Sequence, residues 1–236
     1  MQLLRDHDEV PHLPQLHTHP SPPSRAHRTN RAGRRSIPLP GRPRPGHHAR
    51  MIDTTALAEK PVLTGDRIRL VPLSERHATA FHATFQDPET RRLTGTHQDW
   101  SLAGLRAWIA ECGARTDRLD LAIEDRETGG YLGDLALSRI DPANAHAGFR
   151  IALAPSATDR GIGSEAIRLL LGHAFERVGL HRVQLEVFAY NDRARRAYER
   201  CGFVLEGRMR EALHWDGAWH DVLVMAALRP ERAGAR

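Results

Sequence analysis

The apolar residues from position 61 onward repeat with two different periods. Alternation of apolar and polar residues predicts strands over residues 67–73, 119–124, 131–140, 146–153, 182–188, 203–213 and 219–228. Apolar residues three and four apart predict helices over residues 74–86, from 101, over 164–178 and from 191, and Asp87-Pro88 starts a further short helical turn. This order predicts a mixed α/β (α+β) fold, in which helices flank a single, mostly antiparallel central sheet.

Three glycines mark the ends of predicted elements. Gly179 follows the helix over 164–178, whose apolar residues form one stripe, and Gly202 follows the short helix that starts at Asn191. Gly217 follows Asp216 between the last two strands, and an Asp-Gly pair is typical of a two-residue hairpin turn. We therefore expect the last two strands to form a hairpin.

The first fifty residues show neither period. They hold nine of the 15 prolines, seven of the 15 histidines, and nine arginines against three acidic residues, a net charge of +6. Such a segment buries too little apolar surface to offset the entropy of ordering. We predict a disordered tail over residues 1–60, one domain over 61–230 and a C-terminal tail over 231–236. The composition changes abruptly at Met51, which suggests that translation starts there and that residues 1–50 are an upstream extension.

The net charge of the whole chain, +5, is a property of this tail. Residues 51–236 hold 25 basic and 26 acidic residues, and no aromatic residues lie among the arginines of the tail for base stacking. A nucleic-acid partner is therefore not expected. The alternative is that the arginines form an arm that binds an anionic partner in a salt-dependent way.

Several other classes of protein are excluded by composition. The chain has no run of 18 apolar residues that would span a membrane, and no apolar core of a secretory signal. Its two cysteines, Cys112 and Cys201, are far apart and form no metal-ligand pattern. We expect a cytoplasmic protein with two reduced thiols, no metal and no membrane partner.

A glycine loop separates a predicted strand from the longest predicted helix. In residues 158–166, Gly161 and Gly163 allow a tight turn, and the amides that follow point outward at the positive end of the helix dipole. Such a turn either binds a phosphate group or is a simple connection. It lacks the Gly-Lys-Ser/Thr of a Walker loop. A dinucleotide fingerprint matches formally, but seven residues separate Leu153 from Gly161, and the expected ribose-binding acid, Glu186, lies inside a strand.

Three segments together resemble the GCN5-related N-acetyltransferase superfamily, particularly its ribosomal-protein N-terminal acetyltransferase-like branch. They are the glycine loop, the stretch Asn191-Asp-Arg-Ala-Arg-Arg-Ala-Tyr198 that continues to Gly202-Phe203, and the ending from Glu206 to Asp221. The resemblance covers roughly residues 62–229. It implies the fold of that superfamily and transfer of an acetyl group from acetyl-CoA to a primary amine in a ternary complex. The acceptor would be a protein N-terminus or a small molecule.

The resemblance also implies roles for individual residues. Tyr198 stands at the family's general-acid position, where a phenol with a pKa of about 10 would donate a proton to the leaving thiolate. A purely structural role, as a core tyrosine for Tyr198 and as a helix N-cap for Asn191, is the alternative. The residues implied to contact acetyl-CoA are Phe149, Ile151, Ala152, Leu153, Arg160, Gly161, Ile162, Gly163, Ser164, Asn191 and Ala194.

The chain departs from the family pattern at Thr158, where the family has Arg or Gln. This change removes a long polar side chain from the diphosphate site. We expect the backbone amides to bind there all the same, with Arg160 supplying the charge and with weaker or shifted cofactor contacts.

The acceptor side is less defined by the sequence. His97, Asp134 and Glu186 are candidates for the base that deprotonates the incoming amine, and a water chain is the alternative. His97 and Trp100 lie where the family builds its acceptor pocket, so they are candidate substrate contacts. A non-catalytic acyl-CoA-binding or sensory domain is the competing interpretation, against which Asn191 and Tyr198 argue. Both a monomer and a homodimer are compatible with these features.

Overall fold

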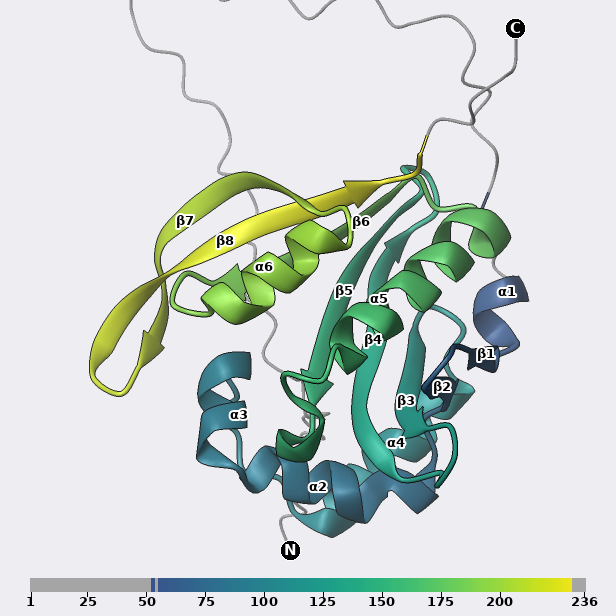
Figure 1. The fold of residues 1–236 in the computed structure, drawn as a ribbon, viewed down its shortest axis with the longest axis horizontal. Coiled ribbons are helices and arrows are strands. Elements are labelled where there is room, and N and C mark those ends of the chain that lie inside the picture. Colours follow the sequence, from purple (N-terminus) through teal and green to yellow (C-terminus); the bar gives the residue numbers. More distant parts are fainter. Residues whose placement is uncertain (1–51, 54, 231–236) are drawn as a thin grey trace, which may run out of the picture.

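A mixed sheet organises the part of the chain that the structure describes. The computed structural model describes residues 52, 53 and 55–230, whose eight strands lie in the order β1-β2-β3-β4-β5-β6-β8-β7 (Figure 1). The strands are β1 (Leu63–Thr64), β2 (Ile68–Pro72), β3 (Leu119–Asp125), β4 (Tyr131–Asp141), β5 (His146–Leu153), β6 (Arg182–Phe188), β7 (Val204–Trp215) and β8 (Ala218–Leu228). The α-helices are α1 (Thr55–Ala58), α2 (Ala78–Gln86), α3 (Pro88–Thr94), α4 (Leu102–Ala114), α5 (Ile162–Gly172) and α6 (Asp192–Arg200). They are joined by the 3₁₀ turns η1 (Glu75–His77) and η2 (Pro155–Ala157) and by the π-helical segment η3 (His173–Val178).

Apolar residues cover both faces of this sheet because neighbouring side chains of a strand point to opposite sides. One core packs the sheet against α5, η3 and α6, and α5 crosses the near face of the central strands in Figure 1. The second core packs the other face against α2 and α4, with Phe81 and Trp108 against Val71 and Ala122. The strand β6 shows the alternation most clearly, since Val183, Leu185 and Val187 are buried and the residues between them are not.

The two central strands separate along their length. Strands β5 and β6 pair in parallel only from His146↔Arg182 to Gly148↔Gln184. Beyond that point β5 remains paired with β4 up to Gly133↔Leu153, and β6 remains paired with β8 up to Phe188↔Val222. The main chain of residues 149–153 therefore has no strand partner on its β6 side among the described residues.

The fold expected from the sequence is confirmed, including its mixed, mostly antiparallel sheet. The boundary next to the glycine loop differs: the long helix begins at Ile162, two residues before Ser164, because Gly161 with φ 76° caps it and its carbonyl accepts the amide of Glu165. Its last turn widens into η3, and Gly179 with φ 86° ends it as expected.

The start of the domain also requires a correction. We expected residues 1–60 to be a disordered tail, but α1 precedes residue 61, and both Ile52 and Leu57 are buried in the core that packs on α5. The amide of Asp53 donates to the carbonyl of Val178 at 2.7 Å, which ties this segment to η3. The expectations for residues 1–50 and 231–236 lie outside the described residues. Among those described, no helix is long and apolar enough to cross a membrane.

Candidate functional site

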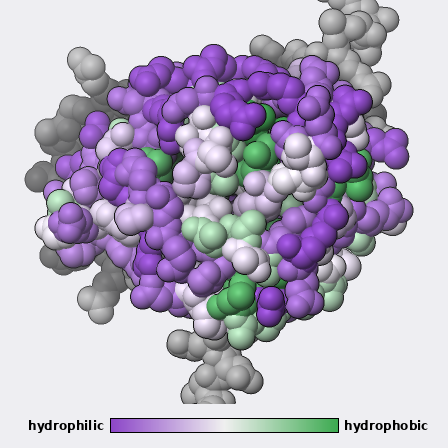
Figure 2. Space-filling model, turned by 60° about the horizontal axis from the view of Figure 1, so that its bottom comes forward, coloured by the Kyte–Doolittle hydropathy of each residue, from purple (hydrophilic) through white to green (hydrophobic). Residues whose placement is uncertain are grey.

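A cavity of about 770 Å³ lies at the point where β5 and β6 separate. Its wall comes from α3, β5, the loop that leads into α5, β6, α6 and β7. The face in Figure 2 is hollowed near its centre, where less polar residues gather inside a border of polar ones. A cavity of this size takes a ligand larger than an amino acid.

The glycine loop forms one end of this cavity through Gly161, Gly163 and Ser164. Within the described chain, the amides of residues 160–164 donate to no backbone carbonyl. Glu165 is the first residue of this turn whose amide does so, and its acceptor is the carbonyl of Gly161. Unpaired amides at a helix start are donors for an anion, and the helix dipole adds to their attraction. The loop therefore has the chemistry of a phosphate site.

Arg67 holds this loop in place from the start of β2. Its Nη1 donates to the carbonyl of Arg160 at 2.7 Å, and its amide and Nε donate to the carboxylate of Glu165 at 2.9 and 3.0 Å. Burial opposes ionisation of Glu165, but the hydrogen bonds from Arg67 hold the pKa of its carboxyl below the ordinary value. A Cβ on Gly161 would lie 3.2 Å from the guanidinium of Arg67, so this position favours glycine for both conformation and space.

Strand β5 supplies the wall next to the loop. All four predicted residues of this strand, Phe149, Ile151, Ala152 and Leu153, line the cavity. Because β5 has no partner on this side beyond Gly148, its free main-chain groups are available to a ligand lying along it.

Helix α6 forms the opposite wall with Asn191, Ala194 and Tyr198. The side-chain oxygen of Asn191 accepts the amide of Ala194 at 3.1 Å, so this residue is the N-cap of the helix and also borders the cavity. Tyr198 is 8% exposed and packs edge-on against Phe149 and Phe203. Burial raises the pKa of Tyr198 well above its ordinary value, so the phenol is protonated at neutral pH.

Two of the four candidates for the acceptor side lie on the cavity wall. Glu186 projects from β6 and is half-buried, with Arg139 4.0 Å away. Burial raises the pKa of Glu186 above its ordinary value, and Arg139 opposes this shift only in part. His97 follows α3 and stacks on Trp215, with 4.7 Å between ring centroids.

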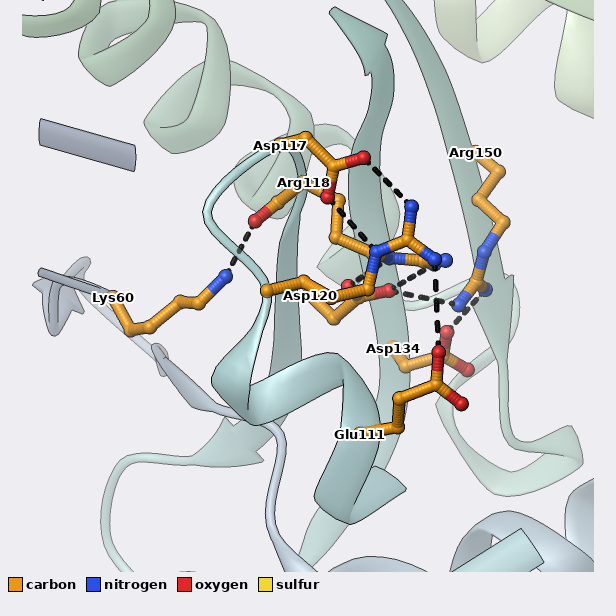
Figure 3. Close-up of polar contacts among 8 residues, drawn as sticks. Lys60, Glu111, Asp117, Arg118, Asp120, Asp134 and Arg150 are labelled. Carbon is orange, nitrogen blue, oxygen red and sulfur yellow. Dashed lines mark hydrogen bonds and ion pairs between the residues drawn. The ribbon is translucent and has the colours of Figure 1, made fainter. Parts of the chain in front are cut away.

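The other two candidates are not on the cavity wall. Asp134 is fully buried and forms an ion pair with Arg150, which also approaches Asp120, so these residues form a charged network within the sheet (Figure 3). Burial raises the pKa of Asp134, although Arg150 opposes the shift. Trp100 is 8% exposed and packs against Trp108 in the core under α4. The ion pair with Arg150 accounts for the environment of Asp134, and core packing accounts for that of Trp100.

Two of the loop residues also lie away from the cavity wall. Ile162 is 2% exposed and belongs to the core, so a ligand would meet only its main chain. The guanidinium of Arg160 donates to the carbonyl of Ser156 at 3.3 Å instead of facing the cavity.

Several residues of the cavity wall were not expected from the sequence. They come from segments that are distant in the chain, and those inside the resembling stretches, such as Arg193 and His214, carry no local signal for the cavity, so only the folded arrangement identifies them. They include Asp87, Glu89 and Leu93 near α3, Arg139 and Arg150 on β4 and β5, Arg193 and Arg200 on α6, and Leu213 and His214 on β7.

The fold agrees with the comparisons to known proteins. Residues 67–204, more than half of the chain, match the acetyltransferase (GNAT) domain, so the chain belongs to this family. The uncharacterised N-acetyltransferase YoaA of Bacillus subtilis is 25% identical over 173 residues, which cover 72% of this chain and 98% of that protein. The putative ribosomal N-acetyltransferase YdaF of the same bacterium is 32% identical over 108 residues, 46% of this chain and 59% of that protein.

A solved structure supports the same fold. The crystal structure of spermidine N-acetyltransferase from Vibrio cholerae in complex with CoA and spermine matches with a TM-score of 0.66 and 24% identity, over 70% of this chain and 97% of that chain. The expectation of an acetyltransferase is therefore confirmed at the level of the family: the protein is an enzyme of the GNAT acetyltransferases.

Proposed function

We propose that this acetyltransferase transfers the acetyl group of acetyl-CoA directly to a primary amine while both substrates occupy the cavity. The observation that carries the proposal is the cavity itself. It joins the free amides at the start of α5 to the unpaired edge of β5, with Tyr198 and Glu186 on its wall. Acetyl-CoA would supply an activated thioester, and the residues of this chain bind, orient and exchange protons with it.

The cofactor half holds and aligns the thioester. The amides of residues 160–164 bind the diphosphate, while the pantetheine arm lies along residues 149–153 of β5 and beside Asn191 and Ala194 of α6. A main-chain amide of the unpaired β5 edge donates to the thioester carbonyl as negative charge develops on its oxygen. Loss of one such donor costs about 3–4 kcal/mol of transition-state stabilisation in comparable sites.

Tyr198 supports the departure of the thiolate. Its hydroxyl makes no hydrogen bond within the described residues and belongs to the cavity wall, and its pKa is raised by burial. A protonated phenol at that place donates a proton to the sulfur as its carbon–sulfur bond breaks. A core position and this role coexist, since Tyr198 packs against Phe149 and Phe203 and also lines the cavity.

Glu186 is the base that the geometry favours. It lies in the cavity, whereas Asp134 is buried in an ion pair with Arg150, and a carboxylate with a raised pKa takes up a proton more readily near neutral pH. His97 is the second candidate, since it lines the same half of the cavity. Either residue removes a proton from the ammonium form of the acceptor before the neutral amine attacks.

The acceptor is a primary amine of a protein N-terminus or of a small molecule. The putative ribosomal acetyltransferase among the relatives supports the first, together with the resemblance to the ribosomal-protein N-terminal acetyltransferase-like branch. The structure crystallised with CoA and spermine supports the second. We assign the chain to that branch as part of this proposal.

The test is release of free CoA from acetyl-CoA across a panel of amines. The panel contains peptides with free N-termini, the same peptides with blocked N-termini, polyamines and amino sugars. We expect at least one unblocked amine to raise CoA release far above the rate without acceptor, with a product heavier by one acetyl group. Tight binding of acetyl-CoA without transfer to any amine in the panel would contradict transfer to an amine and point to a different acceptor.

A further inference from the structure

The position of the glycine loop at which the family pattern has Arg or Gln carries an uncharged residue in this chain. Thr158 stands at the position of the family's Arg or Gln, and its hydroxyl donates to the carbonyl of Pro155 at 2.9 Å. Arg160, which we expected to replace the charge, bonds to Ser156 and does not line the cavity. Arg67 holds the loop from outside through Arg160 and Glu165. The diphosphate would therefore meet amides but no charge from these residues.

Four arginines line the cavity in the described part of the chain, and three of them are poorly placed to replace this charge. Arg139 lies next to Glu186, and Arg150 is paired with Asp134 in the sheet. Arg200 is near the end of α6 and forms no ion pair with the loop. The fourth, Arg193, contacts the loop directly.

Arg193 reaches across from the first turn of α6 to the glycine loop. Its Nη1 donates to the carboxylate of Asp159 at 3.1 Å, and Asp159 also lines the cavity. Asp159 has a left-handed backbone (φ 58°) and lies two residues before Gly161, so it belongs to the loop that leads to the free amides. This ion pair brings the guanidinium to the loop that binds the phosphates.

Arg193 can exchange the carboxylate of Asp159 for another anion at low cost. Both side chains are exposed, 47% for Arg193 and 71% for Asp159, and exposed ion pairs contribute little net free energy. A diphosphate carries more charge than one carboxylate and accepts two parallel hydrogen bonds from a guanidinium. Asp159 in turn would repel a diphosphate that lies nearby, which favours opening of the pair when such a ligand binds.

We infer that Arg193 is the side-chain cation for the cofactor diphosphate in this protein, and that Asp159 holds it over the loop until the cofactor replaces that carboxylate. The inference rests on the proposed function, because it requires that the cavity binds CoA. The family pattern gives this role to position 158, before the glycine loop. The inference assigns it to Arg193, on α6. Arg193 lies between Asn191 and Ala194 of the family motif, so the helix that carries the motif also positions this cation.

The first test measures binding of CoA to the full-length protein by calorimetry, without turnover. Arg193→Ala is expected to raise the Kd for CoA about tenfold, as loss of a charged hydrogen-bonding pair predicts. Arg196→Ala is the matched control, since it removes the same charge from an exposed position of α6 that does not line the cavity. Equal affinities of the two variants would overturn the inference.

The second test separates direct binding from an effect on the shape of the loop. Asp159→Asn keeps a residue that tolerates a left-handed backbone, and we expect it to bind CoA as tightly as the wild type or more tightly. In that background Arg193→Ala should still weaken binding. If Asp159→Asn weakens binding as much as Arg193→Ala, and the double variant is no weaker, Arg193 acts only by holding the loop and the inference is wrong.

The third test identifies the phosphate. The effect of Arg193→Ala should be the same for CoA and for 3′-dephospho-CoA, because both carry the diphosphate. An effect that disappears with 3′-dephospho-CoA would place the guanidinium on the 3′-phosphate and overturn the assignment. A wild-type protein that fails to bind CoA at all would count against the proposed function itself, whereas normal binding that Arg193→Ala leaves unchanged would count against this inference alone.

Discussion

The two halves of the cavity are built in different ways. The cofactor half comes from two short stretches, residues 149–164 and 191–198, and offers mainly main-chain groups and apolar side chains. The acceptor half comes from side chains near α3 and on β4, β6 and β7, which are far apart in the chain. A ligand shared by a whole family can be bound by backbone that every member has, whereas an acceptor that differs between members needs side chains that vary. In the proposed reaction the first half would hold the thioester, and the second half would select the acceptor and supply the base.

The largest effect is expected at Tyr198, where the two halves meet. Tyr198→Phe keeps the packing against Phe149 and Phe203 but removes the hydroxyl, so kcat should fall about 10²- to 10⁴-fold with unchanged affinity for CoA. Tyr190→Phe is the matched control, because its hydroxyl bonds to the carbonyl of Arg92 and does not line the cavity. Steady-state kinetics and calorimetry check both variants. An equal, small loss of kcat in both would remove Tyr198 from the mechanism.

The next effect tests whether the acceptor half contributes to the chemistry. Glu186→Gln should lower kcat/KM about 10²-fold at neutral pH, since it removes the base. Burial raises the pKa of Glu186. In the wild type the carboxylate therefore becomes protonated as the pH decreases through that raised value, and kcat/KM falls with it. The variant should lack this acidic limb, which a pH–rate profile would show. A limb that persists in Glu186→Gln belongs to another group, and His97 would then be the candidate.

A smaller effect concerns the backbone of the cofactor half. Gly161→Ala places a side chain at φ 76°, which strains the backbone, and 3.2 Å from the guanidinium of Arg67, which must move aside, so the Kd for CoA should rise about tenfold. Gly113→Ala is the control, because a Cβ there meets nothing within 4 Å, and it should leave affinity unchanged. Calorimetry distinguishes them. If both bind CoA like the wild type, the turn at Gly161 does not set the amide positions.

The smallest effect sharpens the boundary of the acceptor half. His97→Ala should raise the KM for the acceptor roughly two- to fivefold, as expected for loss of one exposed contact. Trp100→Phe should leave that KM unchanged and lower the melting temperature, because Trp100 packs in the core against Trp108. Kinetics with the best amine of the panel and a thermal melt give both readouts. If Trp100→Phe raises the KM for the acceptor and His97→Ala does not, Trp100 contacts the acceptor and His97 does not.

Much of the fold could be predicted from the sequence because its elements have strong local signals. The alternation over residues 182–188 and the stripe over 164–178 correspond to β6 and to α5 with η3, with ends within two residues at most. The domain start was predicted less well, since α1 has only four residues and no period. Leu57 is nevertheless buried, because α1 packs against η3, a contact that local sequence does not reveal.

The candidate site divides in the same way. Most of the expected cofactor residues line the cavity, since they lie in continuous motifs, but Arg160 turns away to Ser156. Of the acceptor candidates, Asp134 and Trp100 lie in the sheet and in the core. Polar and aromatic residues have several uses in a fold, and the sequence does not distinguish an ion pair inside a sheet from a base in a cavity.

The sequence by itself determined the order of strands and helices, the turn at Gly161 and Gly163, and the helix that carries Asn191 and Tyr198. These features depend on local periodicity and on backbone conformations that few residues adopt. Only the tertiary structure decided where β5 leaves β6, which arginine reaches the loop, and which side chains form the acceptor half. Those contacts join residues that are distant in the chain, and they depend on packing, which no local pattern encodes.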